Sequence, residues 1–396
     1  MAEYKRLGDY IREVNVRNRE LKVTNLLGVS ISKEFMPSIA NTIGTDMSTY
    51  KIVERGQFAY GPVTSRNGDK VSIALLDGYD DAIISQAYTV FEVVDHEQLL
   101  PEYLMMWFRR PEFDRYARFH SHGSAREIFD WDELCDVMLP IPSITRQHEI
   151  VAEYETLTNR IRLNNQMIQH LEATAQALYR KTFVDNIDKE NLPEGWRSST
   201  LKYILQKYIR GPFGSALKKE DMQSSGVPVY EQQHVIDNHR CFRYYISNEK
   251  YIQLKRFAIQ NDDLIISCSG TIGRVIQIQE SDNKGVINQA LLILRVNKSV
   301  FSPIILRYFL QSEIGHKMLI EDAHGSAQVN IAKRENIESI PIIIPNAKII
   351  KALDEDLQLI DRRISIYQQE NSKLTELQSL LLVKMGQYNA MKIYCI

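Results

Sequence analysis

The side chains most often used for catalysis or metal binding are present, but they are not arranged for either. The four cysteines (Cys135, Cys241, Cys268 and Cys395) form no C-x-x-C pair and have no histidine nearby at zinc-ligand spacing. The nine histidines form no ligand-spaced cluster. The sequence also lacks a G-x-x-x-x-G-K-[ST] phosphate loop, an H-E-x-x-H motif and a G-x-S-x-G turn. We therefore expect reduced thiols and a protein that is not an enzyme, with no cofactor and no metal.

Polar and basic residues on predicted turns are the remaining candidates for chemistry. Gly270-Thr271-Ile272-Gly273 lies between two strand-like runs, which predicts a strand-to-strand turn. Close approach of its backbone to a phosphate is the alternative. Further upstream, cations alternate with aromatic residues between Arg240 and Arg256. This pattern fits phosphate contact, and it fits a solvated pair of strands equally well.

The charge distribution is uneven although the formal net charge is only −2. Residues 1–145 hold 16 Lys and Arg against 22 Asp and Glu, whereas residues 192–345 hold 19 against 15. The first part is therefore acidic and the second mildly basic, so any contact with nucleic acid must be local to one face.

Internal similarity at an offset of 202 or 203 residues indicates that the chain contains two copies of one unit. His122-Gly123-Ser124-Ala125 recurs as His324-Gly325-Ser326-Ala327, and Ser85-Gln86-Ala87 matches Asn288-Gln289-Ala290. Pro101 and Pro303 also correspond, and each precedes a predicted helical stretch, Tyr103 to Arg110 and Ile304 to Glu313. Matches that keep the same order at nearly one offset point to duplication.

Each copy ends in a long segment with a heptad pattern, which predicts a coiled-coil helix. The first seam position is occupied in the first helix by Ile150, Leu157, Asn164, Leu171 and Leu178, and in the second by Leu353, Ile360, Tyr367, Leu374 and Leu381. Asn164, and Asn371 at the interleaved position of the second helix, would fix the register at some cost in stability. Ordinary amphipathic helices that pack on a core are the alternative.

The expected fold class is α/β (α+β), with two duplicated domains separated by two long antiparallel coiled-coil helices and related by pseudo-twofold symmetry. The predicted boundaries are 1–144 for the first domain, 145–188 for the first helix, 189–347 for the second domain and 348–390 for the second helix. The N-terminus shows no signal-peptide pattern, and no apolar run approaches the ~18–20 residues that a membrane span needs. We therefore expect a cytoplasmic protein that does not contact a membrane.

Four motifs in the second copy resemble the specificity subunits of type I restriction–modification systems. These are the opening Leu192-Pro193-Glu194-Gly195-Trp196, the run from Ser267 to Arg274, Ile287-Asn288-Gln289, and Gly325-Ser326-Ala327-Gln328 ahead of Ile340-Pro341. Each is weak alone, but their order, the duplication and the paired coils make the resemblance fairly specific and extend it over the chain. The first copy departs from it: it lacks the Pro-x-Gly-Trp opening, and Tyr60 to Arg66 replaces the glycine turn.

The resemblance implies a non-catalytic DNA-recognition subunit with two target-recognition domains, each contacting half of a bipartite, asymmetric site in double-stranded DNA. It implies that the long helices act as a ruler and as the docking surface for two methyltransferase (modification) subunits. Nuclease/translocase (restriction) subunits would complete the complex. S-adenosylmethionine, ATP and magnesium would belong to those partners.

The candidate DNA-binding residues are polar or basic side chains on predicted turns. In the first copy they are Thr64, Ser65, Arg66, Asn67, Ser85 and Gln86. In the second they are Ser215, Lys218, Gln232, Gln233, His234, Ser269, Thr271, Arg274, Asn288 and Gln289. Two other readings stay open: a recognition module cut from a single-chain nuclease–methyltransferase, and a coiled-coil scaffold whose two domains bind something other than DNA.

Overall fold

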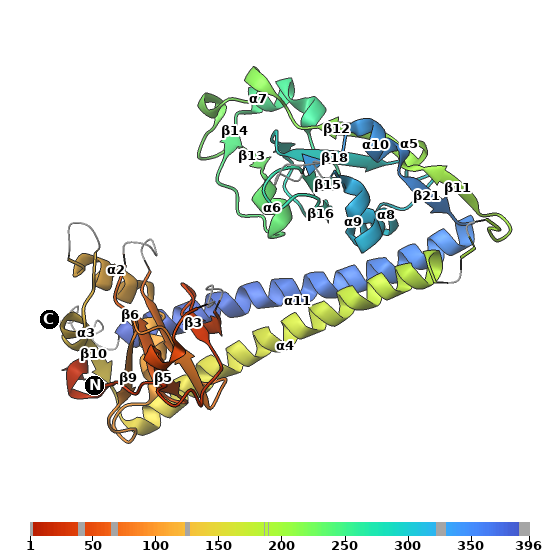
Figure 1. Cartoon of the computed structure of the whole chain (residues 1–396). Helices are drawn as coiled ribbons and strands as arrows, with labels where there is room; N and C mark the ends of the chain where they lie inside the picture. The colour runs from red at the N-terminus through yellow and green to blue at the C-terminus, as the bar shows by residue number, and fades with distance from the viewer. Residues whose placement is uncertain are drawn as a thin grey trace. The chain divides into compact units, whose positions relative to one another are not determined.

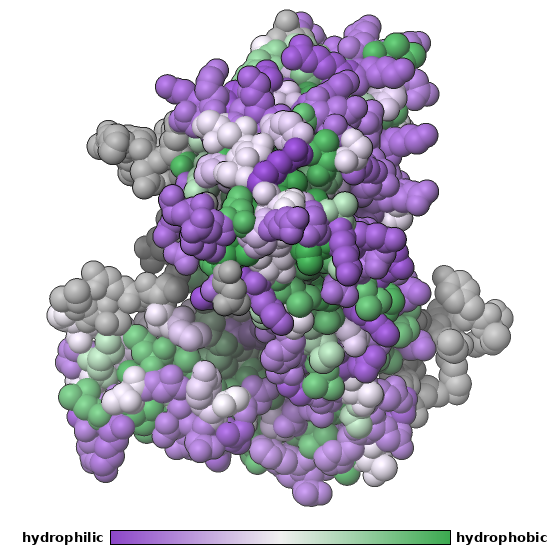
Figure 2. Space-filling model, turned by 90° about the vertical axis from the view of Figure 1, so that its right-hand side faces the viewer, coloured by the Kyte–Doolittle hydropathy of each residue, from purple (hydrophilic) through white to green (hydrophobic). Residues whose placement is uncertain are grey.

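The computed structural model describes residues 3–38, 44–64, 70–122, 127–185, 187–188, 190–321 and 330–387. Contacts divide the chain into two units, one formed by residues 1–164 with 368–396 and the other by residues 165–367. In the described part of the chain, no helix is long and apolar enough to cross a bilayer. Hydrophilic side chains cover most of the face shown in Figure 2, with apolar side chains between them.

The first unit is built on a four-stranded antiparallel sheet in the order β2 (Ile11–Val14), β9 (Thr89–Val93), β6 (Phe58–Gly61) and β7 (Ser72–Leu75). Three antiparallel pairs accompany it: β1 (Glu3–Arg6) with β10 (Met138–Ile141), β3 (Leu27–Val29) with β4 (Phe35–Pro37), and β5 (Lys51–Glu54) with β8 (Asp81–Ile84). The helices of this domain are α1 (Pro101–Phe108), α2 (Pro111–Phe119) and α3 (Trp131–Cys135).

The second unit repeats this sheet, in the order β12 (Leu205–Arg210), β18 (Leu291–Val296), β15 (Leu264–Ser267) and β16 (Val275–Gln277). β11 (Arg197–Thr200) pairs with β21 (Pro341–Ile344) as β1 pairs with β10. β13 (Val227–Tyr230) lies between β14 (Tyr245–Ile246) and β17 (Val286–Ile287), and β19 (Ile320–Glu321) pairs with β20 (Asn330–Ile331). The helices are α5 (Leu201–Ile204), α6 (Gln232–Ile236), α7 (Asn248–Gln253), α8 (Pro303–Gln311), α9 (Glu313–Leu319) and α10 (Arg334–Ser339). The shared strand order confirms the duplication.

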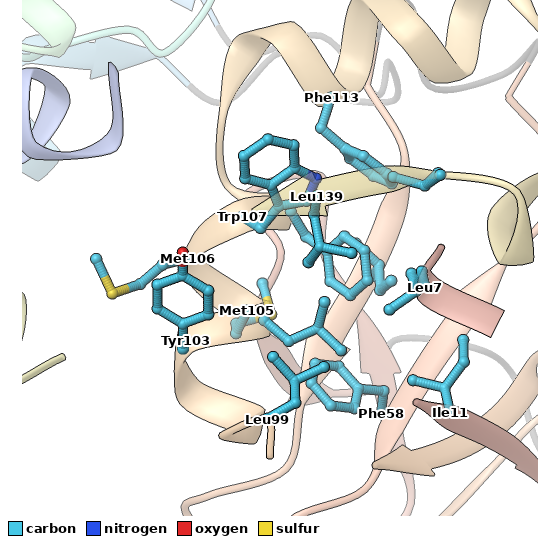
Figure 3. Close-up of a cluster of buried hydrophobic side chains, with 14 of the residues drawn as sticks. Leu7, Ile11, Phe58, Leu99, Tyr103, Met105, Met106, Trp107, Phe113 and Leu139 are labelled. Carbon is cyan, nitrogen blue, oxygen red and sulfur yellow. The ribbon is translucent and has the colours of Figure 1, made fainter. Parts of the chain in front are cut away.

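One face of each sheet is covered by helices, and the core lies between them. In the first unit, Met105 of α1 lies on the side of the helix that faces Phe58 (Figure 3), and Phe108 packs edge-on against the Phe58 ring with centroids 5.9 Å apart. Phe58 stacks on Phe91 of the neighbouring strand with ring centroids 4.7 Å apart. In the second unit, Leu264, Leu292 and Leu294 of the sheet form a core with α8. Such large, fully buried side chains supply most of the stabilisation of a domain of this size.

Two helices are far longer than the rest: α4 (Ile144–Phe183) and α11 (Ala347–Gln387). They lie side by side (Figure 1), and in the first unit they run antiparallel. There Thr158 accepts a hydrogen bond from Gln378 at 2.7 Å, whereas Asn164, farther along α4, donates to Asn371, which lies earlier on α11, at 2.9 Å. The predicted fold class, with mixed domains and two long helices that pack together, is confirmed.

The predicted seam residues lie on the inward stripe of both helices. Ile150, Asn164 and Leu353 are buried, and Leu157, Leu171, Leu178, Ile360, Tyr367, Leu374 and Leu381 are half-buried. The interleaved positions Tyr154, Ala175, Leu357, Ile364 and Met385 are buried as well. This burial pattern repeats with the period expected of a coiled-coil seam.

The first long helix is shorter than the predicted segment 145–188. It ends at Phe183, because the backbone amide of Asp185 donates to the Arg180 carbonyl five residues back and not to that of Lys181, and the Arg180 guanidinium donates to Asp185 at 2.7 Å. This local bonding replaces the next helical turn. The second helix is described to Gln387, and the predicted residues 388–390 lie outside the described part of the chain.

His234 was proposed from the sequence to contact DNA, but the structure places it in the core. Its side chain is 0% exposed and stacks on Phe242 at 4.7 Å. One ring nitrogen accepts a hydrogen bond from the backbone amide of Glu231 at 2.8 Å. The other ring nitrogen lies 3.0 Å from the Cys241 carbonyl oxygen. With both nitrogens engaged and no exposed surface, this histidine holds the segment after β13 in place and does not reach a ligand.

We predict that His234 makes the stability of the second unit depend on pH. Burial lowers the pKa of His234 below its ordinary value of 6.5, although the Cys241 carbonyl acts in the opposite direction. As the pH falls below about 6.5, the unfolded chain therefore binds a proton that the folded chain does not, and stability drops by up to about 1.4 kcal/mol per pH unit. His234→Gln keeps hydrogen-bonding groups but cannot titrate, so its stability should fall less steeply between pH 7 and pH 5.

Urea unfolding followed at several pH values measures this difference. His170→Gln, at an exposed position of α4, is the matched control and should keep the wild-type slope. Equal slopes for wild type and His234→Gln would contradict the assignment.

Candidate nucleic-acid interface

Four turn segments of the second unit meet beside the start of β18. The Asn288 amide donates to the Tyr230 carbonyl at 2.9 Å, which joins the turn after β17 to the end of β13. The Cys268 amide donates to the Ala290 carbonyl at 2.8 Å, and the Gly211 amide donates to the Leu291 carbonyl at 2.9 Å. Residues 211–213, 231–233, 268–274 and 288–290 therefore form one contiguous loop surface, which we call the turn cluster.

Glycines allow these turns to approach each other. A Cβ atom at Gly211 would lie 1.9 Å from the Asn288 carbonyl oxygen, so only glycine fits there. Gly270 and Gly273 have φ values of +66° and +78°, in the left-handed region that glycine adopts without strain. The position of a Cβ at Gly270 is 4.0 Å from Gln232 Cγ, which brings the β15–β16 turn against α6.

The segment 268–274 is a connection between two antiparallel strands, as the sequence pattern predicted. The Ser267 hydroxyl lies 2.6 Å from the Thr271 carbonyl oxygen, to which it donates, and it accepts the Arg274 amide at 3.0 Å. These two bonds hold the turn from within. The side chains of Thr271 and Arg274 are left exposed at its surface.

Seven of the ten candidates in the second copy belong to the turn cluster or border it. Gln232, Gln233, Ser269 and Asn288 are half-buried, and Thr271, Arg274 and Gln289 are exposed. The Asn288 side chain accepts the Ala290 amide at 3.0 Å, so it shapes its own turn as well. The cluster presents amides, hydroxyls and one guanidinium, which are the groups that hydrogen-bond to base edges and phosphates.

The side chains of the other three candidates of the second copy are not part of the exposed surface of the cluster as the structure describes it. His234 is buried, as shown above. Lys218 is exposed and pairs with Glu220 at 3.0 Å. Ser215 lies in the short 3-10 helix Gly214–Ala216, and its side chain lies outside the described part of the structure.

The first copy is only partly described at the equivalent place. Ser85 and Gln86 form the turn that leads into β9, as Asn288 and Gln289 lead into β18. Gln86 is exposed and accepts a bond from Arg17 at 3.4 Å. Thr64 is only 2% exposed, and its hydroxyl bonds to Ser121 and to the Glu127 carbonyl, so its role is internal. Ser65, Arg66 and Asn67 lie outside the described residues.

Sequence reasoning missed Phe213, which is 65% exposed at the edge of the turn cluster. An aromatic side chain this exposed beside polar turns suits stacking or wedging against nucleic-acid bases. The sequence run Arg210-Gly211-Pro212-Phe213 could have indicated it. A Gly-Pro turn follows the strand there, so the Phe213 ring is expected on the turn and not in the core.

No nucleophile or metal site accompanies the cluster in the residues that the structure describes. Burial raises the pKa of the Cys268 thiol to about 11, although Arg210 opposes this shift, so the thiol stays protonated near neutral pH. Within the described ranges, no three His, Cys, Asp or Glu side chains are grouped so that they could hold a metal ion. The cluster is therefore equipped to bind by hydrogen bonds and charge.

Comparisons with known proteins point to one family. Residues 193–376 match the family model of the type I restriction modification DNA specificity domain. Over 275 residues the chain is 22% identical to the EcoBI specificity subunit of Escherichia coli, covering 62% of this chain and 56% of that protein. It is 25% identical over 194 residues to the HindI specificity subunit of Haemophilus influenzae, covering 47% and 42%. The match thus spans about half the length of these two relatives.

Two further similarities cover more of the chain. The MjaIX specificity subunit of Methanocaldococcus jannaschii is 20% identical over 314 residues, or 74% of this chain and 70% of that protein. The crystal structure of a type I restriction–modification S subunit from M. genitalium shares the fold, with a TM-score of 0.57 at 13% identity over 98% of this chain and 96% of that one. Residues 193–376 thus match the type I restriction modification DNA specificity domain family, and the resemblance to type I specificity subunits indicated by the sequence motifs is confirmed.

Proposed function

We propose that the chain is the non-catalytic specificity subunit of a type I restriction–modification complex and recognises a bipartite, asymmetric site in double-stranded DNA. The observation that carries this proposal is the match of residues 193–376 to a DNA specificity domain, whose central strand order recurs in the first unit. Two copies of one DNA-binding domain can each contact one half of a bipartite target. Because its substrate is chromosomal or invading DNA, the protein would act in the cytoplasm.

The two halves of the target would differ because the two copies present different side chains. The turn before β18 carries Asn288 and Gln289, whereas the equivalent turn before β9 carries Ser85 and Gln86. Side-chain amides pair bidentately with adenine in the major groove, and hydroxyls are less selective. We assign Gln232, Gln289 and Arg274 in the second unit to direct DNA contact, and Gln86 in the first.

Docking of methyltransferase subunits is supported by an apolar groove on the paired helices of the first unit. The groove has a volume of about 390 Å³ and is lined by Glu153, Thr156, Leu157, Leu377, Leu380, Leu381 and Lys384. Leu377 and Leu380 are 48% and 52% exposed, which is unusual for leucines that a helix pair could bury. We propose that a methyltransferase subunit covers this groove, and that the nuclease subunits join through the complex so formed. S-adenosylmethionine, ATP and magnesium would act in those partners.

The recognition role predicts a local change of specificity. In the complex with its methyltransferase subunits, Gln289→Ala should relax discrimination at one base pair of one half-site, by about 1–3 kcal/mol, and leave the other half-site unchanged. Fluorescence anisotropy with the cognate duplex and its single-base variants measures this. Gln253→Ala, at an exposed glutamine of α7, is the control and should change nothing. Unchanged discrimination in Gln289→Ala would remove this residue from the recognition set.

If a methyltransferase subunit covers the apolar groove, a charged side chain introduced there should weaken assembly. Leu380→Glu should weaken assembly with the methyltransferase about a hundredfold or more, because the new carboxylate loses its hydration in the interface and an ion pair with Lys384 offsets only part of that cost. The side chain is half exposed in the free chain, so the fold should survive, as circular dichroism would show. Ile252→Glu exchanges an apolar residue that is 69% exposed on α7 and should assemble normally. Normal assembly of Leu380→Glu, measured by analytical ultracentrifugation, would place the docking surface elsewhere.

A further inference from the structure

A second cavity, in the second unit, has a strongly basic lining. It has a volume of about 390 Å³ and is lined by Tyr208, Arg210, Arg256, Ile331, Ala332, Lys333 and Arg334. Four of these seven residues are cations and none is acidic. A concave site of this composition attracts anions, because its cations raise the potential inside the cavity.

Three separate parts of the domain bring these cations together. Tyr208 and Arg210 alternate along β12, so both side chains lie on the same face of the sheet. Arg256 comes from the 3-10 helix Lys255–Phe257, which contacts β12. Lys333 and Arg334 follow β20 at the start of α10. The cavity is therefore fixed by the fold and not by a single flexible loop.

Two of the four cations at this site, Arg210 and Arg256, carry charges that no carboxylate neutralises within the described residues. Arg334 has an ion pair with Glu338 at 2.7 Å, and its guanidinium lies over the Tyr208 ring at 5.1 Å. Arg210 and Arg256 make no ion pair with a described carboxylate; they lie over the rings of Phe213 and Phe257 at 5.9 and 5.6 Å. Cation–aromatic contacts hold a guanidinium in place while leaving its charge available.

One nitrogen of Arg210 lacks a partner altogether. Its Nη1 atom is buried and has no hydrogen bond with any described group. A buried donor without an acceptor is destabilising, and such groups in native proteins usually mark a missing ligand, ion or water. An anion bound between Arg210 and Arg256 would neutralise both charges, and a small rotation of the Arg210 guanidinium would bring this donor to it.

The cavity lies beside the surface proposed to contact DNA, which indicates that the anion is a phosphate of the DNA. Arg210 ends β12, and the next residue, Gly211, packs directly against the Asn288 carbonyl of the turn cluster. Arg210 also interacts with Cys268, at the first residue of the glycine turn. The basic cavity therefore borders the surface proposed to contact DNA.

We propose that this cavity is a clamp for one backbone phosphate of the DNA held by the turn cluster. Arg210 and Arg256 are its principal ligands. The clamp rests on the proposed function and adds to it a sequence-independent contact that would set the register of the second domain on its half-site.

The first unit does not repeat the clamp in its described residues. Tyr208 pairs with Leu294, which pairs with Leu264, and the equivalent row in the first sheet is Glu13, Phe91 and Phe58. Glu13 therefore occupies the position in the first sheet that corresponds to Tyr208, which lines the basic cavity in the second. The clamp would make the second half-site the stronger electrostatic anchor, in line with the excess of cations in residues 192–345.

The salt dependence of DNA binding tests the clamp. In the complex with methyltransferase subunits, Arg256→Gln and Arg210→Gln should each lower the slope of log affinity against log salt by about 1. Affinity for the cognate duplex and for an unrelated duplex should fall by the same factor. The wild type should lose roughly three- to fourfold more affinity than either variant between 50 and 200 mM salt. Arg256→Lys should retain most of the slope.

The control is Lys202→Gln, which removes the same charge from an exposed position on α5, before the opposite end of β12. It should keep the wild-type slope. If the wild-type complex binds the cognate duplex specifically while Arg256→Gln and Arg210→Gln keep the wild-type slope, the clamp is wrong and the proposed function stands. If either variant changes preference at a single base pair, the arginine contacts a base and the phosphate assignment is overturned. A wild-type complex that binds no DNA would remove the proposed function itself.

Discussion

The packing of α4 against α11 is the interaction on which the rest of the structure depends. In the first unit, Ile150 and Tyr154 of α4 and Leu382 and Met385 of α11 belong to the same hydrophobic core as the sheet and α1. In the second unit, residues of both helices, among them Tyr179 and Leu353, complete the other core. Neither domain buries its apolar face with residues of its own sequence segment alone. The last helix of the chain must therefore return to the first domain for that domain to be complete.

The hydrogen bond between Asn164 and Asn371 shows how this packing is held in one register. Asn164 is only 1% exposed, so its amide is removed from water and must find a partner in the seam. Arg160 and Glu370 form an ion pair at 2.8 Å beside it. A shift of either helix by one heptad would separate the two asparagines and set Asn371 against Leu157 or Leu171. The polar pair is less stabilising than two leucines would be, but it disfavours every alternative register.

Much of the fold was predictable from the sequence because the signals are local. The heptads of Ile150 to Leu178 and Leu353 to Leu381 predict long helices, and the glycine turn 270–273 predicts a connection between strands. The burial of His234 was not predictable, because it depends on the fold bringing Phe242 against the face of its ring and the Cys241 carbonyl to one of its ring nitrogens. The basic cavity was also hidden, since Arg210 and Arg334 come from distant segments. Exposure on turns was predictable for residues such as Thr271 and Arg274, whereas the internal bonding of Thr64 was not, because its partners Ser121 and Glu127 lie far away in the sequence.

We propose that two copies of one domain, completed by a shared pair of helices, each recognise half of a DNA target. Methylation-motif sequencing of a host that expresses this chain with its methyltransferase tests the claim most directly. We expect a motif of two different short sequences separated by an unspecified gap. We also expect that replacing residues 193–344 with the same segment of another specificity subunit changes one half of the motif only. A single continuous motif, or a replacement that alters both halves, would contradict the claim.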